Sequence, residues 1–314
     1  MTQPIPAPLP LPSDFVGGVC ELPHVSVLLA EGPDAVSFLH SQLTHDFALL
    51  RTGQARLCGY CSPKGRLLAS FVGFKRSEQQ VLLMLSSDLA STTLKRLSMF
   101  VLRAKVRLSD VTAQCPVRGV AGSTLTSWLG AAELAPWQHL EHAGGDLITL
   151  YPALGQARAL WLGAGSPPAL PALSLDDWLG LEVHSGVAQV QAATVDAFVP
   201  QMLNYESVDG VSFKKGCYPG QEVVARSQFR GAIKRRAHLY ASPVPLPAGT
   251  ELFVSQDTTQ PAGIVAQAAP WAGQTVLIAS VQLSAVEASG DVLQDAQGHR
   301  LTALPMPYDL RHDL

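Results

Sequence analysis

Apolar and polar positions along the first half of the chain predict strands and helices in alternation. A strand is predicted over 24–32, which reads HVSVLLAEG. Residues 32–43 place apolar side chains at helical spacing after a proline suited to a first helical turn. Residues 56–76 predict two strands joined by a turn at 62–65, and residues 81–85 predict a short buried strand. A helix and a further mixed segment follow, so this half predicts an α+β architecture.

Two proline-rich breaks, at 163–173 and 242–249, divide the rest of the chain. Both are too short for free linkers, so we expect rigid connections between packed units. A helix is predicted after the first break, because Ser174 precedes Asp177 by three residues in a variant of the capping box. After the second break, short strands separated by turn signals favour a small β-barrel.

Composition limits the class of protein. A chain of 314 residues is longer than one core usually supports, which predicts two or three domains. The net charge of −3 argues against a general nucleic-acid coat, because phosphate binding needs clustered positive charge. No apolar run approaches the roughly 20 residues that span a bilayer. We therefore expect no membrane partner and no direct nucleic-acid partner.

The N-terminal residues and the cysteines indicate the compartment. Residues 1–15, MTQPIPAPLPLPSDF, lack the basic start and apolar stretch of a secretory signal and are typical of a flexible polyproline-like tail or a proline-rich docking ligand. The five cysteines are odd in number and irregularly spaced, which suits reduced thiols better than a disulfide framework. The sequence predicts a cytoplasmic protein.

One cysteine lies in an unusual setting. Cys217 follows Lys214, Lys215 and a glycine, and precedes a Pro-Gly turn and a predicted helix start. Neighbouring cations and a helix N-terminus both favour thiolate over thiol, so we expect a lowered pKa for this cysteine. The alternative is a small buried cysteine in a glycine-rich turn. Seven basic residues and one acidic residue lie between Lys214 and Arg236, which predicts either a solvated face or a pocket for an anionic ligand.

These residues carry a family resemblance. The motif K-G-C-Y-x-G-Q-E at 215–222 resembles the signature of the YgfZ family, folate-binding proteins related to the T-protein of the glycine cleavage system. VPQMLNYE at 199–206 is similar to the family's P-Q-x-x-N segment, and ARSQFRGAIKRR at 225–236 continues the likeness. FLHSQLTHDF at 38–47 and CSPKGRLLASF at 61–71 resemble its N-terminal patterns.

The resemblance implies a fold and a function. It implies three domains in a ring around a folate-lined opening, and a role in assembling or repairing iron–sulfur enzymes, including one that thiomethylates tRNA. It implies tetrahydrofolate or another reduced folate as cofactor, and folate and iron–sulfur client enzymes as partners. With the breaks above, it predicts a flexible tail over 1–22, two intertwined α+β folate-binding domains over 23–236 with internal breaks near 112 and 174, and a C-terminal β-barrel over 237–314.

The resemblance also implies site residues. Cys217 is expected to be the reactive or redox-sensing group, with Lys215 beside it. Folate contacts are expected from residues in or near the matched motifs. These residues are Gln201, Asn204, Tyr218, Gln221, Glu222, Arg226, Arg230 and His184.

His184 marks a departure from the family pattern. The family usually has a glutamate at this place in the helix after Trp178, an acid expected to grip the pterin ring, and here His184 replaces it. Glu182 lies two residues away, which points it to a different side of a helix. The pterin contact is therefore open at this position, and a capping or surface histidine is the alternative interpretation.

Other candidate sites are weaker. Cys58 and Cys61 form a lone CxxC in a predicted strand, where side chains three residues apart point to opposite faces, so no metal site is predicted. Asp46 and Asp88 could lie near folate, although capping or turn formation suits either one. Two alternative functions stay open, a folate-dependent aminomethyl or one-carbon transferase and a non-catalytic adaptor. Whether the chain catalyses a reaction is not decided by these residues.

Overall fold

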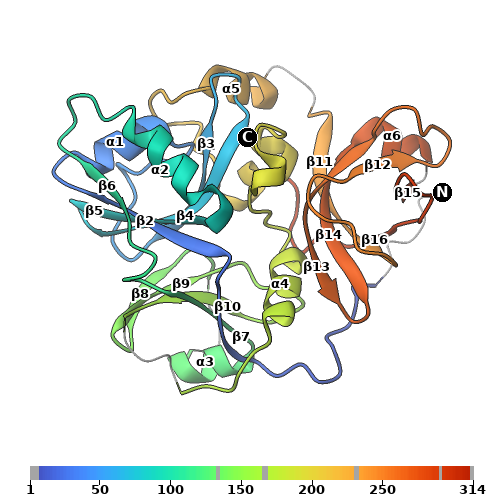
Figure 1. The fold of residues 1–314 in the computed structure, drawn as a ribbon, viewed down its shortest axis with the longest axis horizontal. Helices are drawn as coiled ribbons and strands as arrows, with labels where there is room; N and C mark the ends of the chain where they lie inside the picture. Colours follow the sequence, from blue (N-terminus) through green and yellow to red (C-terminus); the bar gives the residue numbers. More distant parts are fainter. Residues whose placement is uncertain (1–6, 132–134, 165–168, 230–232, 290–291, 312–314) are drawn as a thin grey trace.

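The computed structural model describes most of the chain. The described ranges are 7–131, 135–164, 169–229, 233–289 and 292–311. They form three antiparallel sheets with helices packed against and between them (Figure 1). The predicted α+β class is confirmed.

The first sheet has the strand order β3-β4-β5-β2-β6. The turn predicted between two strands is confirmed, because β3 and β4 pair on either side of it. The helices of this unit are α1 and α2, with a 3₁₀ turn, η1, before α2. The bounds are β2 Val25–Glu31, α1 Ala35–Gln42, β3 Ala55–Cys61, β4 Leu67–Ser77, β5 Gln80–Ser86, η1 Ser87–Leu89, α2 Ala90–Ser98 and β6 Arg107–Asp110.

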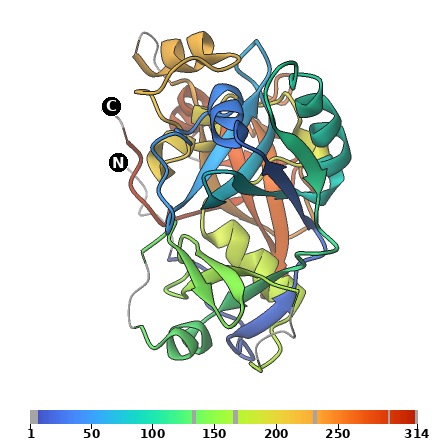
Figure 2. The same cartoon turned by 90° about the vertical axis from the view of Figure 1, so that its left-hand side faces the viewer.

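The second sheet has the order β1-β7-β10-β9-β8, with α3 packed on one face. In the view of Figure 2 it lies below the first sheet. The bounds are β1 Gly18–Glu21, β7 Val117–Ala121, α3 Ser123–Leu129, β8 His139–His142, β9 Gly145–Thr149 and β10 Arg158–Leu162.

The N-terminal segment differs from the expected flexible tail over 1–22. Its last residues form β1, which pairs with β7 from Gly18↔Ala121 to Glu21↔Arg118. Before that strand, the Pro10 carbonyl accepts a hydrogen bond of 3.0 Å from Trp271 Nε1. A proline removes a backbone hydrogen-bond donor only at its own position. Residues 18–21 contain no proline, so the end of the segment can pair as a strand.

The C-terminal sheet has six strands in the order β15-β12-β13-β14-β11-β16 and is nearly closed, which confirms the predicted barrel. It encloses a separate apolar core. The bounds are β11 Arg235–Ser242, β12 Glu251–Val254, β13 Gly263–Trp271, β14 Gln274–Gln282, α6 Leu283–Ser289, β15 Leu293–Gln294 and β16 Thr302–Leu304.

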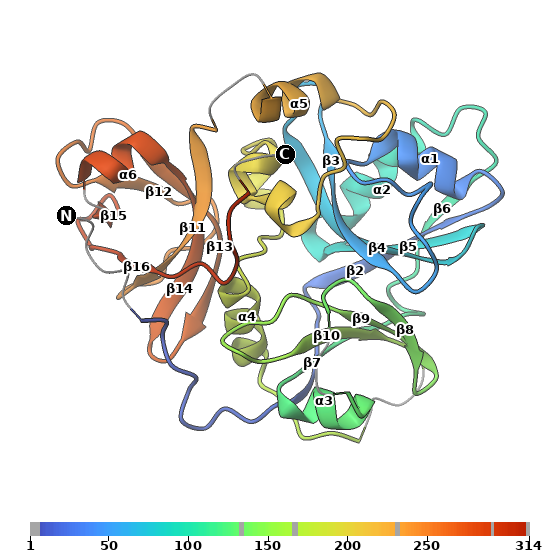
Figure 3. The ribbon, with the colours of Figure 1, turned by 180° about the vertical axis from the view of Figure 1, so that it is seen from behind.

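Helix α4, Leu175–His184, lies between the second and C-terminal sheets (Figures 1 and 3). Its predicted cap is confirmed, because Ser174 Oγ accepts a hydrogen bond from the Asp177 amide at 3.0 Å. Two glycines allow α4 to pack closely against the sheets on both sides of it. A Cβ at Gly180 would lie 2.0 Å from Trp271, and one at Gly119 of β7 would lie 2.4 Å from Trp178. The remaining elements are η2 Ala192–Thr194, η3 Pro200–Leu203, η4 Tyr205–Val208 and α5 Gln221–Phe229.

Candidate functional site

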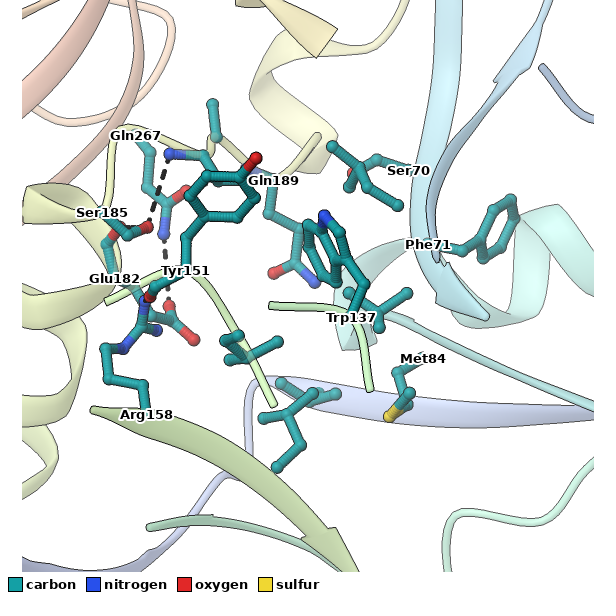
Figure 4. A pocket seen from close by; sticks show the side chains of 17 residues that line it. Ser70, Phe71, Met84, Trp137, Tyr151, Arg158, Glu182, Ser185, Gln189 and Gln267 are labelled. Atoms are coloured by element: carbon teal, nitrogen blue, oxygen red, sulfur yellow. Dashed lines mark hydrogen bonds between the residues drawn. The ribbon is translucent and has the colours of Figure 1, made fainter. Parts of the chain in front are cut away.

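A cavity lies where the three sheets meet (Figure 4). Val72 and Met84 of the first sheet form one wall, Arg158 of the second sheet another, and Gln267 of the C-terminal sheet a third. Its volume is about 70 Å³, and a water molecule's share of liquid volume is about 30 Å³. The cavity therefore holds about two waters, and a larger ligand requires some of its side chains to move.

The polar end of the cavity is the carboxylate of Glu182 on α4. Trp178, one helical turn earlier, donates its indole Nε1–H to Oε1 at 2.7 Å. Gln267 Nε2 donates to Oε2 at 3.2 Å, and His24 Nε2 lies 3.3 Å from Oε1. A carboxylate has about four acceptor positions. Three are used here, so about one remains for a further donor.

The charges around Glu182 keep it ionised. Burial would raise its pKa, but the hydrogen bond and charge of His24 and the charge of Arg158 hold the pKa of Glu182 below its ordinary value. Burial lowers the pKa of Arg158 to about 10, which leaves it a cation at neutral pH. Burial acts to lower the pKa of His24, and its hydrogen bond to Glu182 outweighs this and raises it. The site is therefore an ionised, partly buried carboxylate beside a buried guanidinium.

Aromatic rings form another side of the cavity. Trp137 and Tyr151 meet edge to face, with ring centroids 5.7 Å apart, and Tyr308 contacts Tyr151 at 5.9 Å. The Tyr308 hydroxyl donates to the Gly186 carbonyl at 2.7 Å, which ties the C-terminal segment to the end of α4. Rings beside a carboxylate acceptor suit a flat heteroaromatic ligand that carries N–H donors.

The KGCY motif lies elsewhere in the fold, at the end of α1. Lys215 is buried and donates from Nζ to the carbonyls of His40 and Leu43, the latter at 2.6 Å, with Nζ 4.8 Å from the Tyr218 ring centroid. Burial lowers the pKa of Lys215 to about 8. Its ammonium thus satisfies carbonyls at the C-terminus of a helix. Cys217 is exposed, and neither Cys217 nor Lys215 lines the cavity.

The remaining predicted residues of this region make contacts within the protein. Gln201 Nε2 donates to the Val224 carbonyl of α5 at 2.8 Å, and Asn204 Nδ2 donates to the Ala237 carbonyl of β11 at 2.8 Å. Both are fully buried. Each makes two structural hydrogen bonds to a segment distant in the sequence.

The predicted site residues on α5 are more exposed to solvent than Gln201 and Asn204. Gln221 Nε2 donates weakly to the Lys215 carbonyl at 3.4 Å, and the exposed Arg226 and Glu222 pair at 2.6 Å one helical turn apart. Arg230 lies outside the described residues. None of the predicted site residues between 201 and 226 that the structure describes lines the cavity, although Ser70 and Phe71 of the 61–71 motif do.

Helix α4 presents Glu182, not His184, to the cavity. His184 packs edge to face on Trp271, with ring centroids 5.0 Å apart, and burial lowers its pKa to about 4. The two residues do point to different sides of the helix, as expected, but the cavity lies on the side of Glu182. The cavity side of α4 thus carries an acid, Glu182, two positions before His184.

Other predicted groups have partners within the protein. Asp46 accepts from the Leu49 amide at 2.9 Å, and Asp88 accepts from the Ala192 amide at 2.8 Å. Cys58 and Cys61 are both buried, and burial raises the pKa of each. Within the described residues, no group of three or more His, Cys, Asp or Glu side chains could hold a metal ion.

Sequence reasoning missed most of the cavity. Trp137, Tyr151, Arg158 and Gln267 come from separate segments and carry no local motif. Two sequence signals point to cavity residues: Glu182 follows Trp178 by four residues on a predicted helix, and Ser70 and Phe71 lie in the 61–71 motif.

The chain as a whole is similar to known proteins. No family model matches the chain. The "tRNA-modifying protein YgfZ" of Edwardsiella ictaluri is 32% identical over 298 residues, covering 88% of each chain. The chain belongs to the YgfZ family.

Further relatives extend the YgfZ match over nearly the whole length. The protein of the same name from Yersinia enterocolitica is 29% identical over 321 residues, which cover 98% of this chain and 97% of that one. Among solved structures, the glycine cleavage system aminomethyltransferase T from Bartonella henselae aligns with a TM-score of 0.66 at 15% identity, over 93% of this chain and 86% of that chain. This YgfZ-family chain thus has a T-protein-like fold. In the part of the chain that the structure describes, no helix is long and apolar enough to cross a membrane.

Proposed function

We propose that this chain binds a reduced folate in the central cavity and supports the assembly or repair of iron–sulfur enzymes, including enzymes that modify tRNA. The observation that carries the folate proposal is the ionised Glu182 carboxylate, held by Arg158 and His24 beside aromatic rings where three sheets meet. The family membership and the relatives' name support the connection to tRNA modification.

The cavity fits the chemistry of a pterin ring. Such a ring carries adjacent N–H donors, and the Glu182 carboxylate retains about one free acceptor position. A second position becomes available if the Gln267 amide turns away from Oε2. Trp137 and Tyr151 offer ring surfaces, and the ring needs side chains to move because the cavity is small. A bound reduced folate would supply a one-carbon carrier.

Cys217 is proposed as the reactive group of the protein, acting outside the cavity. Its thiol is exposed in the loop before α5, while Lys215 anchors that loop to the end of α1. An exposed thiol on an anchored loop is accessible to an oxidant or, for exchange, to a disulfide of a partner.

Binding is tested by isothermal titration with tetrahydrofolate. We expect saturable binding by the wild type and loss of binding in Val72→Phe, which fills the cavity from β4. The matched control is Val16→Phe, the same change at a side chain that is 56% exposed. Absence of wild-type binding would overturn the folate proposal, and so would equal affinity of the two variants and the wild type.

The role in cells is tested in a strain that lacks its YgfZ-family protein. The measurement is thiomethylated nucleoside in tRNA, quantified by mass spectrometry. We expect this chain to restore the modification and Cys217→Ser, a nearly isosteric change, to fail at equal abundance. Restoration by the serine variant would show that the thiol is not the reactive group.

The fold likeness favours one alternative, an aminomethyltransferase. A transferase would form methylenetetrahydrofolate from tetrahydrofolate and an aminomethyl-lipoyl donor and would release ammonia. Product formed at a rate proportional to the concentration of this chain would establish the alternative.

A further inference from the structure

The turn after α2 exposes an unusual group of apolar side chains. Met99 is 69% exposed, Phe100 45% and Leu102 85%. Eight large hydrophobic side chains are exposed among the described residues, and three of them lie in these four consecutive positions. The turn lies at the outer edge of the first sheet, on the side away from the C-terminal sheet (Figures 1 and 3). A local concentration of exposed apolar surface usually marks an interaction site.

The turn is ordered by its own backbone. The Phe100 amide donates to the Leu97 carbonyl at 3.0 Å, and the Val101 amide donates to the Ser98 carbonyl at 3.2 Å. The Leu102 amide donates to the Phe100 carbonyl at 3.0 Å. Leu97 is buried and Val101 packs against the core, so these two side chains anchor the turn. The ordered backbone of the turn therefore keeps the side chains of Met99, Phe100 and Leu102 exposed to solvent.

Basic residues surround the apolar turn. Residues 95–107 include five exposed basic side chains and no acidic residue, in a chain whose net charge is −3. Arg107 pairs with Glu31 at 3.4 Å, and Arg96 hydrogen-bonds Tyr60. No ion pair joins Lys95, Arg103 or Lys105 to a described residue. The surface thus combines an apolar centre with uncompensated positive charge.

We infer that this surface, Lys95–Arg107, docks the iron–sulfur client enzyme through an apolar pocket with an acidic rim. The inference rests on the proposed function. Positive charge in excess of its acidic neighbours, Glu31 at Arg107 and Asp34 at the Lys105 amide, selects an anionic partner and steers its approach. Transfer of the Met99 and Leu102 side chains out of water lowers the free energy of a complex. A protein pocket provides such burial, and phosphate groups do not. A protein partner therefore explains both parts of the surface, whereas RNA explains only the basic part.

The test uses the strain and the tRNA measurement described above. The apolar variant is Met99→Ser/Leu102→Ser, and the matched control is Leu140→Ser/Val195→Ser, two exposed apolar side chains outside this surface. We expect the apolar variant to lower the thiomethylated nucleoside at least threefold and the control to leave it unchanged. Both should keep the wild-type midpoint of thermal unfolding within a few degrees and the tetrahydrofolate affinity within twofold.

Contact is tested with a photo-crosslinking residue at position 102 and a tagged iron–sulfur enzyme that thiomethylates tRNA. We expect a cross-link from position 102, lost at high salt, and none from position 140. Normal modification with the apolar variant, or no cross-link from position 102, would overturn the inference while leaving the proposed function intact. Failure of the wild-type chain to restore modification would instead overturn the proposed function and this inference with it.

Two other ligands are distinguished by direct binding. Labelled bulk tRNA and vesicles of phosphatidylcholine and phosphatidylglycerol at about 70:30 are titrated with wild type, the apolar variant and Lys95→Glu/Arg103→Glu. Binding of wild type to tRNA that only the charge variant loses would make this an RNA surface. Vesicle binding that both variants lose would make it a membrane contact. Either result overturns the docking of an enzyme.

Discussion

The amide of Gln267 joins the C-terminal sheet to α4 through the carboxylate of Glu182, with Nε2 3.2 Å from Oε2. The same side chain accepts from the Gln189 amide at 2.9 Å through Oε1. A β-bulge between Val265 and Gln267 interrupts the register of β13 with β14. Bulges redirect side chains, and here the residue at the bulge contacts the cavity. A ligand that competes for Glu182 would therefore act on the contact between α4 and the C-terminal sheet.

Gln267→Leu should destabilise the protein by roughly 1–3 kcal/mol, because the Gln189 backbone amide and one Glu182 oxygen lose their partners. The measurement is the free energy of unfolding in urea. Gln274→Leu is the control, since Gln274 is exposed on β14 and should change stability by less than about 0.5 kcal/mol. Equal effects at the two positions would contradict a structural role for the Gln267 amide.

Glu182→Gln should weaken tetrahydrofolate binding by roughly 1–3 kcal/mol, the usual loss for a hydrogen bond to a charged group. The change removes the charge and keeps the shape. Arg226→Ala serves as comparison, because Arg226 is exposed and paired only with Glu222 among the described residues. Calorimetric titration of both variants locates the ligand. Weakening in Arg226→Ala alone would place folate at α5, as the motif resemblance first implied.

Lys215→Met should destabilise the protein by roughly 1–3 kcal/mol, because the His40 and Leu43 carbonyls lose their donor. Lys214→Met is the matched control, since Lys214 is the exposed neighbour in the same loop. Denaturant unfolding at pH 7 compares them. A stable Lys215→Met protein would mean that the ammonium does not hold this loop.

Stability should fall below neutral pH partly because of His184. Its folded pKa of about 4 lies below the ordinary value of 6.5, so between these values the unfolded state binds a proton that the folded state does not. Stability is therefore lost as pH falls through this range, by roughly 2 kcal/mol at pH 5. The His184→Leu variant should lose about that much less than wild type between pH 7 and 5 in urea unfolding. Parallel losses would mean that His184 titrates normally.

Cys217 should react first with iodoacetamide at pH 7. It is the exposed cysteine, whereas burial raises the pKa of Cys20 and Cys61 to about 12 and that of Cys58 still further. Mass spectrometry of timed digests gives the rate for each site. A faster reaction at the half-buried Cys115 would argue against Cys217 as the reactive thiol.

Local signals in the sequence determined most elements and the family. Apolar periodicity predicted α1, the β3–β4 pair and the C-terminal strands, because side-chain spacing reports secondary structure directly. The Ser174–Asp177 cap depends on residues three apart and was equally visible. The KGCYPGQE segment carried the resemblance, since it is contiguous.

Only the tertiary structure decided where the candidate site lies. Glu182 and His184 are both polar residues on one helix, and the choice between them depends on which neighbours cover each face. The contact of Lys215 with the end of α1 joins residues 175 positions apart, and Gln267 reaches Glu182 across 85 positions. Such contacts arise from packing of whole sheets. No spacing along the chain encodes them, so the cavity became visible only once the three sheets were placed together.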